Sequence, residues 1–285
     1  VYCGLASADS AAESGSAGST LVAAVVDDTG RLLDVCEVSD DAGGYAKLGS
    51  LLAERAGGRS GATVAADSDD HTLVSLLGAA GHLIAIADDD SVEDFAERFS
   101  DDESPDEIAS PPAGRRAVGM ARALQAGALS PAALPVPRDL AAYKPVLAAH
   151  AAMLSGRHTA AVALREVLRE LYPAALRAFS DPADPVALAV LNALPEPGML
   201  SARRGAADPE AVVASLAAEG VGDHATIKDA VTALHIAISE TPRRNAAPPA
   251  LAEATAEAVR QAIAAVRAYD VGDRALMKTV AARLA

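Results

Sequence analysis

The sequence predicts an α/β domain followed by an all-α region that contains one long helix. Two observations predict the α/β domain: short hydrophobic segments recur in the first part of the chain, and turn or helical patterns separate them. A third observation predicts the all-α region. Mostly apolar side chains recur at seven-residue spacing from Pro145 to Leu171, and only helical patterns follow. The 285 residues suffice for one large domain or two ordinary ones.

The first three hydrophobic segments predict consecutive antiparallel strands. Val1, Cys3 and Leu5 alternate in the opening segment, and Ser19–Val26 and Arg31–Val38 follow at the spacing of a hairpin. Between these two the chain reads Asp-Asp-Thr-Gly, in which the glycine supplies the positive φ of a tight turn.

Helix and strand patterns then alternate. We expect a helix that ends at about residue 56, a strand over 62–66, a helix over 71–80 and a strand over 82–87. Three antiparallel strands followed by helix, strand, helix and strand is the order of the ribonuclease H-like fold, an α/β sheet covered on both faces. Ser91 is expected to cap a short helix over 92–99. The acidic, proline-containing residues 100–113 are expected to form a mobile loop.

After a helix over 114–126, the segment from Pro145 to Leu171 predicts the longest helix. Its seven-residue repeat suits a coiled coil or a dimer seam, and a single buried helix of a bundle is an equal alternative. We expect a homodimer through this helix. Two polar residues on the repeat, His150 and Arg157, favour a seam that water partly enters or a seam whose register these residues fix. The seam residues are Leu147, His150, Leu154, Arg157, Ala161, Leu164, Leu168 and Leu171.

The chain therefore divides into three predicted segments. Residues 1–130 form the ribonuclease H-like domain, 131–180 the long helical, coiled-coil-like linker, and 181–285 a helical region. In the last segment we expect separate helices over Pro185–Leu194, Asp208–Glu219, Ile227–Glu240, Leu251–Tyr269 and Arg274–Leu284.

Composition limits the classes of function. The formal net charge of −15 argues against a strong nonspecific grip on nucleic acid, because phosphate contacts need cationic side chains. We find no apolar stretch long enough to span a membrane and no secretory leader. Cys3 and Cys36 fall on predicted strands and are interpreted as core thiols of a cytoplasmic protein.

Four short stretches together carry a family resemblance. They are Cys-Gly-Leu-x-x-x-x-Ser from Cys3, Ala-Ala-Gly-His over Ala79–His82, Ala117–Leu124, and Arg165–Phe179 at the end of the long helix. In order and spacing the chain resembles the DEDD-type insertion-sequence transposases of the IS one-ten group over nearly its whole length. The resemblance implies a ribonuclease H-like domain that holds divalent metal ions with three Asp and one Glu, a helical linker, and a domain with a nucleophilic Ser.

The chain departs from that family where its acids would stand. The first family Asp corresponds to Ala6, the Glu falls near Asp67, and the last two Asp residues correspond to Ala113 and Arg116. The serine-bearing domain is not expected within these 285 residues. Because two metal ions need convergent carboxylates, we expect a catalytically inactive protein with no bound metal and no cofactor.

The remaining polar residues suggest little chemistry. The Asp clusters are interpreted as solvated loop charge, and His71 and His82 as a helix cap and a strand-edge residue. Neither Ser7 nor Ser10 has an evident His or Asp partner, so a serine nucleophile has no support. Weak nucleic-acid contacts are expected from Arg115, Arg116, Arg157 and Arg165.

Two functions of different class follow. The first is a repurposed, inactive transposase relative that acts as a dimeric regulatory or scaffolding protein. The alternative is a nucleic-acid-binding protein that keeps recognition of DNA or RNA without cleavage. An active DNA-cleaving transposase is a distant third, because it would need Asp67, Asp9 and loop acids to rebuild a metal site.

Overall fold

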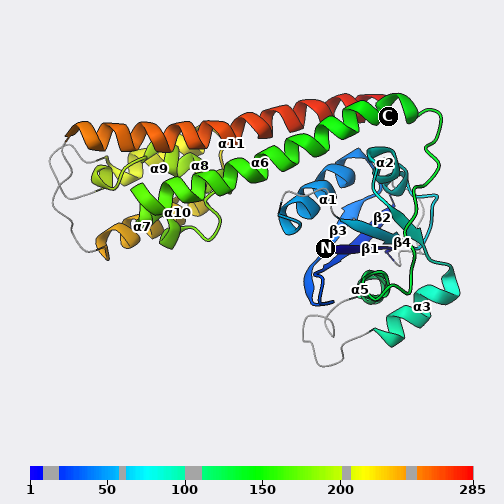
Figure 1. Cartoon of the computed structure of the whole chain (residues 1–285). Coiled ribbons are helices and arrows are strands. Elements are labelled where there is room, and N and C mark those ends of the chain that lie inside the picture. The colour runs from blue at the N-terminus through cyan, green and yellow to red at the C-terminus, as the bar shows by residue number, and fades with distance from the viewer. Residues whose placement is uncertain (9–18, 58–61, 100–110, 201–206, 242–248, 285) are drawn as a thin grey trace. The chain divides into compact units, whose positions relative to one another are not determined.

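In the computed structural model, which describes residues 1–8, 19–57, 62–99, 111–200, 207–241 and 249–284, five strands form one mixed sheet (Figure 1). The strand order is β3-β2-β1-β4-β5. The first three strands pair antiparallel, whereas β4 runs parallel to β1 and to β5. The five predicted strands are confirmed, with the bounds β1 Tyr2–Ser7, β2 Thr20–Val26, β3 Leu32–Ser39, β4 Thr63–Ala66 and β5 Ile84–Ile86.

The β2–β3 turn is the predicted tight hairpin. Gly30 has a φ of 82°, in the left-handed region that favours glycine. The Asp27 carboxylate accepts hydrogen bonds from the main-chain N–H groups of Thr29 and Arg31. Asp27 therefore closes the turn locally, and the turn fixes the register of the two strands.

Helices α1 (Ala42–Arg55) and α2 (Thr72–Ala80) cover one face of the sheet, as Figure 1 shows. This face, here called the leucine face, is filled by large side chains. Its buried residues include Cys3, Leu5, Leu21, Val25, Tyr45, Leu48, Leu52, Leu73, Leu76 and Leu77. The alternation of β1 places Cys3 and Leu5 on this face, because successive strand residues point to opposite sides.

Helix α5 (Pro112–Gln125) covers the other face, here called the alanine face, and α3 (Asp89–Arg98) packs beside α5. Its buried side chains are mostly small and include Ala6, Ala24, Ala65, Ala85, Ala113 and Ala117. A Cβ added to Gly4 would lie 1.9 Å from the main-chain oxygen of Ala117. The backbone of α5 therefore sits directly on β1, at a distance that only glycine permits.

Two predicted boundaries on this face are wrong. Ser91 does not cap α3; its main-chain N–H donates to Asp88 Oδ1 at 2.9 Å, and Asp88 is the N-cap. An Asp at this position accepts an otherwise unpaired N–H of the first turn. The predicted loop over 100–113 overlaps the start of α5, where Pro112 occupies the first turn. Residues 100–110 lie outside the described part.

The long helix is confirmed as α6 (Lys144–Leu171), preceded by a short 3-10 turn over Ala141–Tyr143. The last two predicted helices are in fact one, α11 (Pro249–Leu284). Gly272 does not interrupt it, since a single glycine inside a helix costs only about 1 kcal/mol. A Cβ at Gly272 would lie 3.3 Å from Met153 Sδ of α6, so a small residue suits this contact.

The chain forms two compact units. Unit 1 comprises Val1–Gly156 and Val271–Ala285, and unit 2 comprises Arg157–Asp270. Leu147 of α6 and Met277 and Val280 of α11 join the leucine-face core of unit 1. The division into segments 1–130, 131–180 and 181–285 stays a prediction.

Unit 2 contains only helices among its described residues, and its core includes Leu164, Leu168, Tyr172, Leu188, Leu191, Ile227, Val259 and Ile263. Its further elements are α7 Pro173–Ala178, α8 Pro185–Ala193, a 3-10 turn over Pro197–Leu200, α9 Pro209–Ala218 and α10 His224–Ser239. Side chains of Asp184, Asp208 and Asp223 cap α8, α9 and α10. In the described ranges no helix combines the length and apolar character that crossing a membrane requires.

Candidate functional site

The candidate site lies where the parallel strands β1 and β4 end. In α/β sheets, ligands and catalytic groups commonly gather beyond the carboxyl ends of strands, at the point where the strand order reverses. Ser7 ends β1 and Asp67 follows β4. The main-chain N–H of Ser7 donates to Asp67 Oδ2 at 2.7 Å, and the N–H of Asp67 donates to the main-chain oxygen of Leu5 at 3.2 Å. Asp67 is thereby fixed across the two strand ends.

His71 connects this carboxylate to a second one. It stands at the N-cap position of α2 but makes no capping bond with its side chain, so its predicted role as a cap is wrong. Its Nε2 lies 2.9 Å from Asp67 Oδ1, and its Nδ1 lies 3.6 Å from Asp40 Oδ2. Asp40 accepts the N–H of Leu73 in the first turn of α2 at 2.7 Å. Asp40, after β3, therefore supplies the capping oxygen.

The pKa of His71 is raised and the pKa of Asp67 is lowered, and both changes favour the ionised form of this pair. The hydrogen bond to Asp67 raises the pKa of His71 against the opposing effect of burial, and the charges of Asp67 and Asp40 add to the increase. For Asp67, burial is the largest single influence and would raise the pKa. Hydrogen bonds from His71 and Ser7 together outweigh it, and the pKa of Asp67 is lowered.

Ser7 does have a His and an Asp partner, contrary to the expectation from the sequence. Its Oγ lies 3.4 Å from His71 Nε2. The same nitrogen lies 2.9 Å from Asp67, and the carboxylate that faces the opposite nitrogen, Asp40, lies 3.6 Å away, beyond hydrogen-bond distance. A Ser-His-Asp relay needs the hydroxyl and a carboxylate hydrogen-bonded to opposite ring nitrogens, so these contacts do not form one. Asp9 and Ser10 lie outside the described residues.

The other positions singled out by the resemblance in the sequence lie around the end of β1. Ala6 and Ala113 are buried in the same alanine-face core and offer no polar group. Arg116, one turn after Ala113, donates from Nη2 to the main-chain oxygen of Ser7 at 3.0 Å. Its Nη1 lies 3.4 Å from Glu93 Oε1 of α3. A guanidinium thus stands at the strand end, and within the described residues no three His, Cys, Asp or Glu side chains are grouped so as to hold a metal ion.

The four arginines predicted for nucleic-acid contact do not form one group. Arg115 and Arg116 lie on α5 in unit 1, and only Arg115 is exposed. In unit 2, Arg157 pairs with Asp270 at 2.5 Å and also donates to the main-chain oxygen of Ala183. Arg165 donates to the main-chain oxygen of Ser180 at 2.9 Å. Three of these cations are therefore engaged by the chain itself.

The predicted seam of α6 is largely buried within the chain. The apolar members Leu147 and Leu154 are buried in unit 1, Leu164 and Leu168 are buried in the core of unit 2, and Ala161 is partly buried there. Leu171 alone among them is exposed, at 38%. This arrangement corresponds to the alternative of a buried helix, and the homodimer stays a prediction.

The polar seam residue of unit 1 faces α11. His150 is buried, its ring packs on Tyr45 with centroids 5.1 Å apart, and its Nε2 lies 2.9 Å from Asp273 Oδ1. The distance is that of an ion pair, although the orientation is not that of a hydrogen bond. Burial, followed by the charge of Asp273, raises the pKa of Tyr45.

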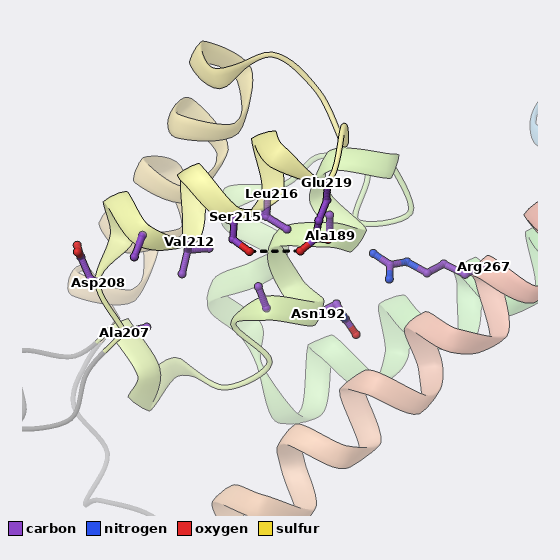
Figure 2. Close-up of a pocket in the computed structure, with 11 residues that line it drawn as sticks. Ala189, Asn192, Ala207, Asp208, Val212, Ser215, Leu216, Glu219 and Arg267 are labelled. Atoms are coloured by element: carbon purple, nitrogen blue, oxygen red, sulfur yellow. Dashed lines mark hydrogen bonds between the residues drawn. The ribbon is translucent and has the colours of Figure 1, made fainter.

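Unit 2 contains a shallow pocket of about 450 Å³ that the sequence did not indicate (Figure 2). Ala189 and Asn192 of α8, residues 207–219 around α9, and Arg267 of α11 line it. Ser215 donates to Glu219 at 3.3 Å along its rim. Because the lining comes from three separate helices, and Arg267 of α11 is distant in sequence from the other two, no local motif could have revealed it. Acidic and basic groups both border the pocket, which favours no single ligand class.

Comparison with known proteins gives one informative similarity. The chain is 35% identical over 160 residues to a Streptomyces coelicolor protein named "Mini-circle putative transposase for IS117". The match covers 55% of this chain and 37% of the relative. The chain therefore spans little more than a third of that protein, to which it is related at a distance. No family model matches the chain, and no solved structure matches it.

Proposed function

We propose that the protein is a catalytically inactive relative of the DEDD-type insertion-sequence transposases that acts as a regulatory or scaffolding protein. Unit 1 is its ribonuclease H-like domain. The strand order β3-β2-β1-β4-β5 supports this assignment, with three antiparallel strands followed by two parallel ones and helices on both faces. The distant similarity to the "Mini-circle putative transposase for IS117" supports the broader relationship to insertion-sequence transposases.

The observation that carries the inactivity is the placement of Arg116. Metal-dependent phosphoryl transfer needs several carboxylates that converge on divalent ions. At the end of β1 the chain instead presents a guanidinium bonded to Ser7 and close to Glu93. Ala6 and Ala113, buried among alanines, supply no ligand. The remaining Asp67 has both oxygens in contact with Ser7 and His71.

A scaffolding role fits the charge of the chain. The net charge of −15 disfavours nonspecific binding to nucleic acid, and Arg157 and Arg165 of α6 contact partners in the chain. In this proposal the homodimer is built on a surface other than the seam of α6, because most side chains of that seam are already buried.

A second function, nucleic-acid binding without cleavage, is favoured by one observation. Arg115 is exposed in the first turns of α5, beside the strand ends where a ribonuclease H-like protein would hold its substrate. This candidate shares the inactive centre and differs only in the partner.

One set of measurements separates the two functions. Fluorescence anisotropy with labelled duplex DNA and structured RNA, at low and near-physiological salt, tests binding, and light scattering on the same sample gives the mass. The scaffolding proposal expects a dimer mass and no salt-sensitive binding. Binding that Arg115→Gln weakens, and that the exposed control Arg138→Gln does not, would establish the second function instead. Cleavage of DNA in the presence of Mg²⁺ would refute both.

A further inference from the structure

We propose that the carboxyl end of β1 and β4 is an ion cluster formed by the chain itself, in which the positive charges of His71 and Arg116 offset the carboxylates and divalent metal ions are excluded. The inference rests on the proposed function, because it states what replaced the metal site of an active relative. It concerns five charged residues of unit 1: Asp40, Asp67, His71, Glu93 and Arg116.

The first step is the imidazole of His71. One ring nitrogen lies 2.9 Å from an oxygen of Asp67, and the other lies 3.6 Å from an oxygen of Asp40. The first distance is that of a hydrogen bond, whereas the second is that of an ion pair only. Two carboxylate charges beside one ring favour the imidazolium ion, and His71 is therefore the first cation of the cluster.

The second step is that the carboxylate oxygens are already occupied. Asp67 accepts from Ser7 with Oδ2 and contacts His71 with Oδ1. Asp40 accepts the N–H of Leu73 with Oδ1, and its Oδ2 accepts from Ser19 and faces His71. A metal ion would compete for these oxygens with hydrogen bonds that hold the start of α2 and the end of β1.

The third step is Arg116. Its guanidinium donates to the main-chain oxygen of Ser7, the residue whose N–H is bonded to Asp67, and pairs with Glu93. The end of β1 is thus held by an acid on one side and by a cation on the other. A divalent ion placed beside Asp67 would meet the repulsion of both a guanidinium and an imidazolium.

The residues present therefore do not fit Mg²⁺ or Mn²⁺. Mg²⁺ needs octahedral oxygen ligands, and the two family positions nearest the end of β1 hold Ala6 and Ala113, which have none to offer. The cluster instead joins β1, β4, the loop after β3, α2, α3 and α5 through charges of the chain itself.

The test is binding of Mn²⁺ to the full chain by isothermal titration calorimetry and electron paramagnetic resonance. The double variant His71→Asn/Arg116→Gln removes both cations and leaves the acids. Asn is a favoured N-cap residue, so α2 keeps its start. The matched control is Arg55→Gln, which removes a cation from an exposed ion pair with Asp34 in the same unit.

We expect no saturable Mn²⁺ binding by the parent or the control, and a gain in affinity of about tenfold or more in the double variant. Saturable binding by the parent would overturn the inference, and so would a folded double variant that gains no affinity. Should the double variant not fold, His71→Asn alone is assessed in the same way. A parent that binds Mn²⁺ yet cleaves no DNA would refute this inference and leave the proposed function standing.

Discussion

On one face of the unit 1 sheet leucine is the most frequent buried side chain, whereas on the other it is alanine. The leucine face gains stability from large buried side chains that fill the space below α1 and α2. The alanine face gains it from close approach, with α5 resting on β1 at Gly4. Each face is therefore sensitive to a different change: loss of volume on the first and gain of volume on the second.

This difference also positions the candidate site. Because α5 lies so close to β1, the guanidinium of Arg116 reaches the main-chain oxygen of Ser7. The leucine face contributes through α2, which carries His71 at its start. The ion cluster lies where the two faces meet at the end of the sheet.

The largest effect is expected from Gly4→Ala on the alanine face. The new methyl group would lie 1.9 Å from the main-chain oxygen of Ala117, so α5 would have to move off the sheet. We expect a loss of about 4 kcal/mol or more in the free energy of unfolding, measured by urea denaturation. The control is Gly78→Ala, whose methyl would meet its nearest atom at 3.6 Å. Equal stability of the two variants would contradict the close approach.

Leu76→Ala tests the leucine face. Leu76 of α2 is fully buried, and its truncation removes buried surface and leaves a cavity. The expected loss in the free energy of unfolding is about 3 kcal/mol, again from urea denaturation. Leu83→Ala serves as the control, because Leu83 is 49% exposed and should change the free energy by about 0.5 kcal/mol or less.

His71→Gln tests the place where the faces meet. Losing the charged hydrogen bond to Asp67 should cost about 2 kcal/mol where both partners are ionised. Since the folded pKa of His71 is raised, its contribution is complete below about pH 6.5 and is lost as the pH rises through the folded value. Since that of Asp67 is lowered, the contribution also falls away as the pH drops below about 3.9 and through the folded value.

Thermal melting across this pH range checks the expectation, and His82 provides a control of opposite sign. Burial lowers the pKa of His82, so this residue costs stability as the pH falls below about 6.5. His82→Gln should therefore reduce the stability that is lost as the pH falls. His71→Gln should instead remove the stability that the charged residue contributes at low pH. The same pH dependence in both variants would contradict the assigned environments.

The smallest effect is expected from Gly49→Ala. Gly49 lies on α1, where it faces His150 and Leu154 of α6. The added methyl would lie 3.2 Å from a carbon of His150 and 3.2 Å from a carbon of Leu154, both of which are side-chain atoms. Better helix propensity offsets part of this crowding. We expect a change within about 1 kcal/mol of the parent by urea denaturation. A loss as large as that of Gly4→Ala would mean that the two faces tolerate added volume alike.

Much of the fold was accessible from local pattern. Strand alternation and turn residues predicted all five strands, because each depends on residues near one another in sequence. The missed boundaries were also local in origin: Asp88 rather than Ser91 caps α3, and one glycine does not interrupt α11. A single capping or glycine position contributes about 1 kcal/mol, which tertiary packing readily outweighs.

The candidate site was only half predictable. Matching the chain to a family pattern placed Ala6, Asp67, Ala113 and Arg116 around one point without any view of the fold. The roles of Asp40, His71 and Glu93 could not be read in this way, because Asp40 lies 31 residues from His71 and Glu93 lies 23 residues from Arg116. Each looked like ordinary loop or helix-end charge.

By itself the sequence determined the order of strands and helices and the absence of acids at Ala6, Ala113 and Arg116, since both are properties of residues taken in order. Only the tertiary structure decided what those positions contact. It turned the α6 repeat inward, brought Ser7 to His71, and placed Arg116 against the end of β1. The reason is that burial and ion pairing depend on which elements pack together, and that packing joins residues far apart in the chain.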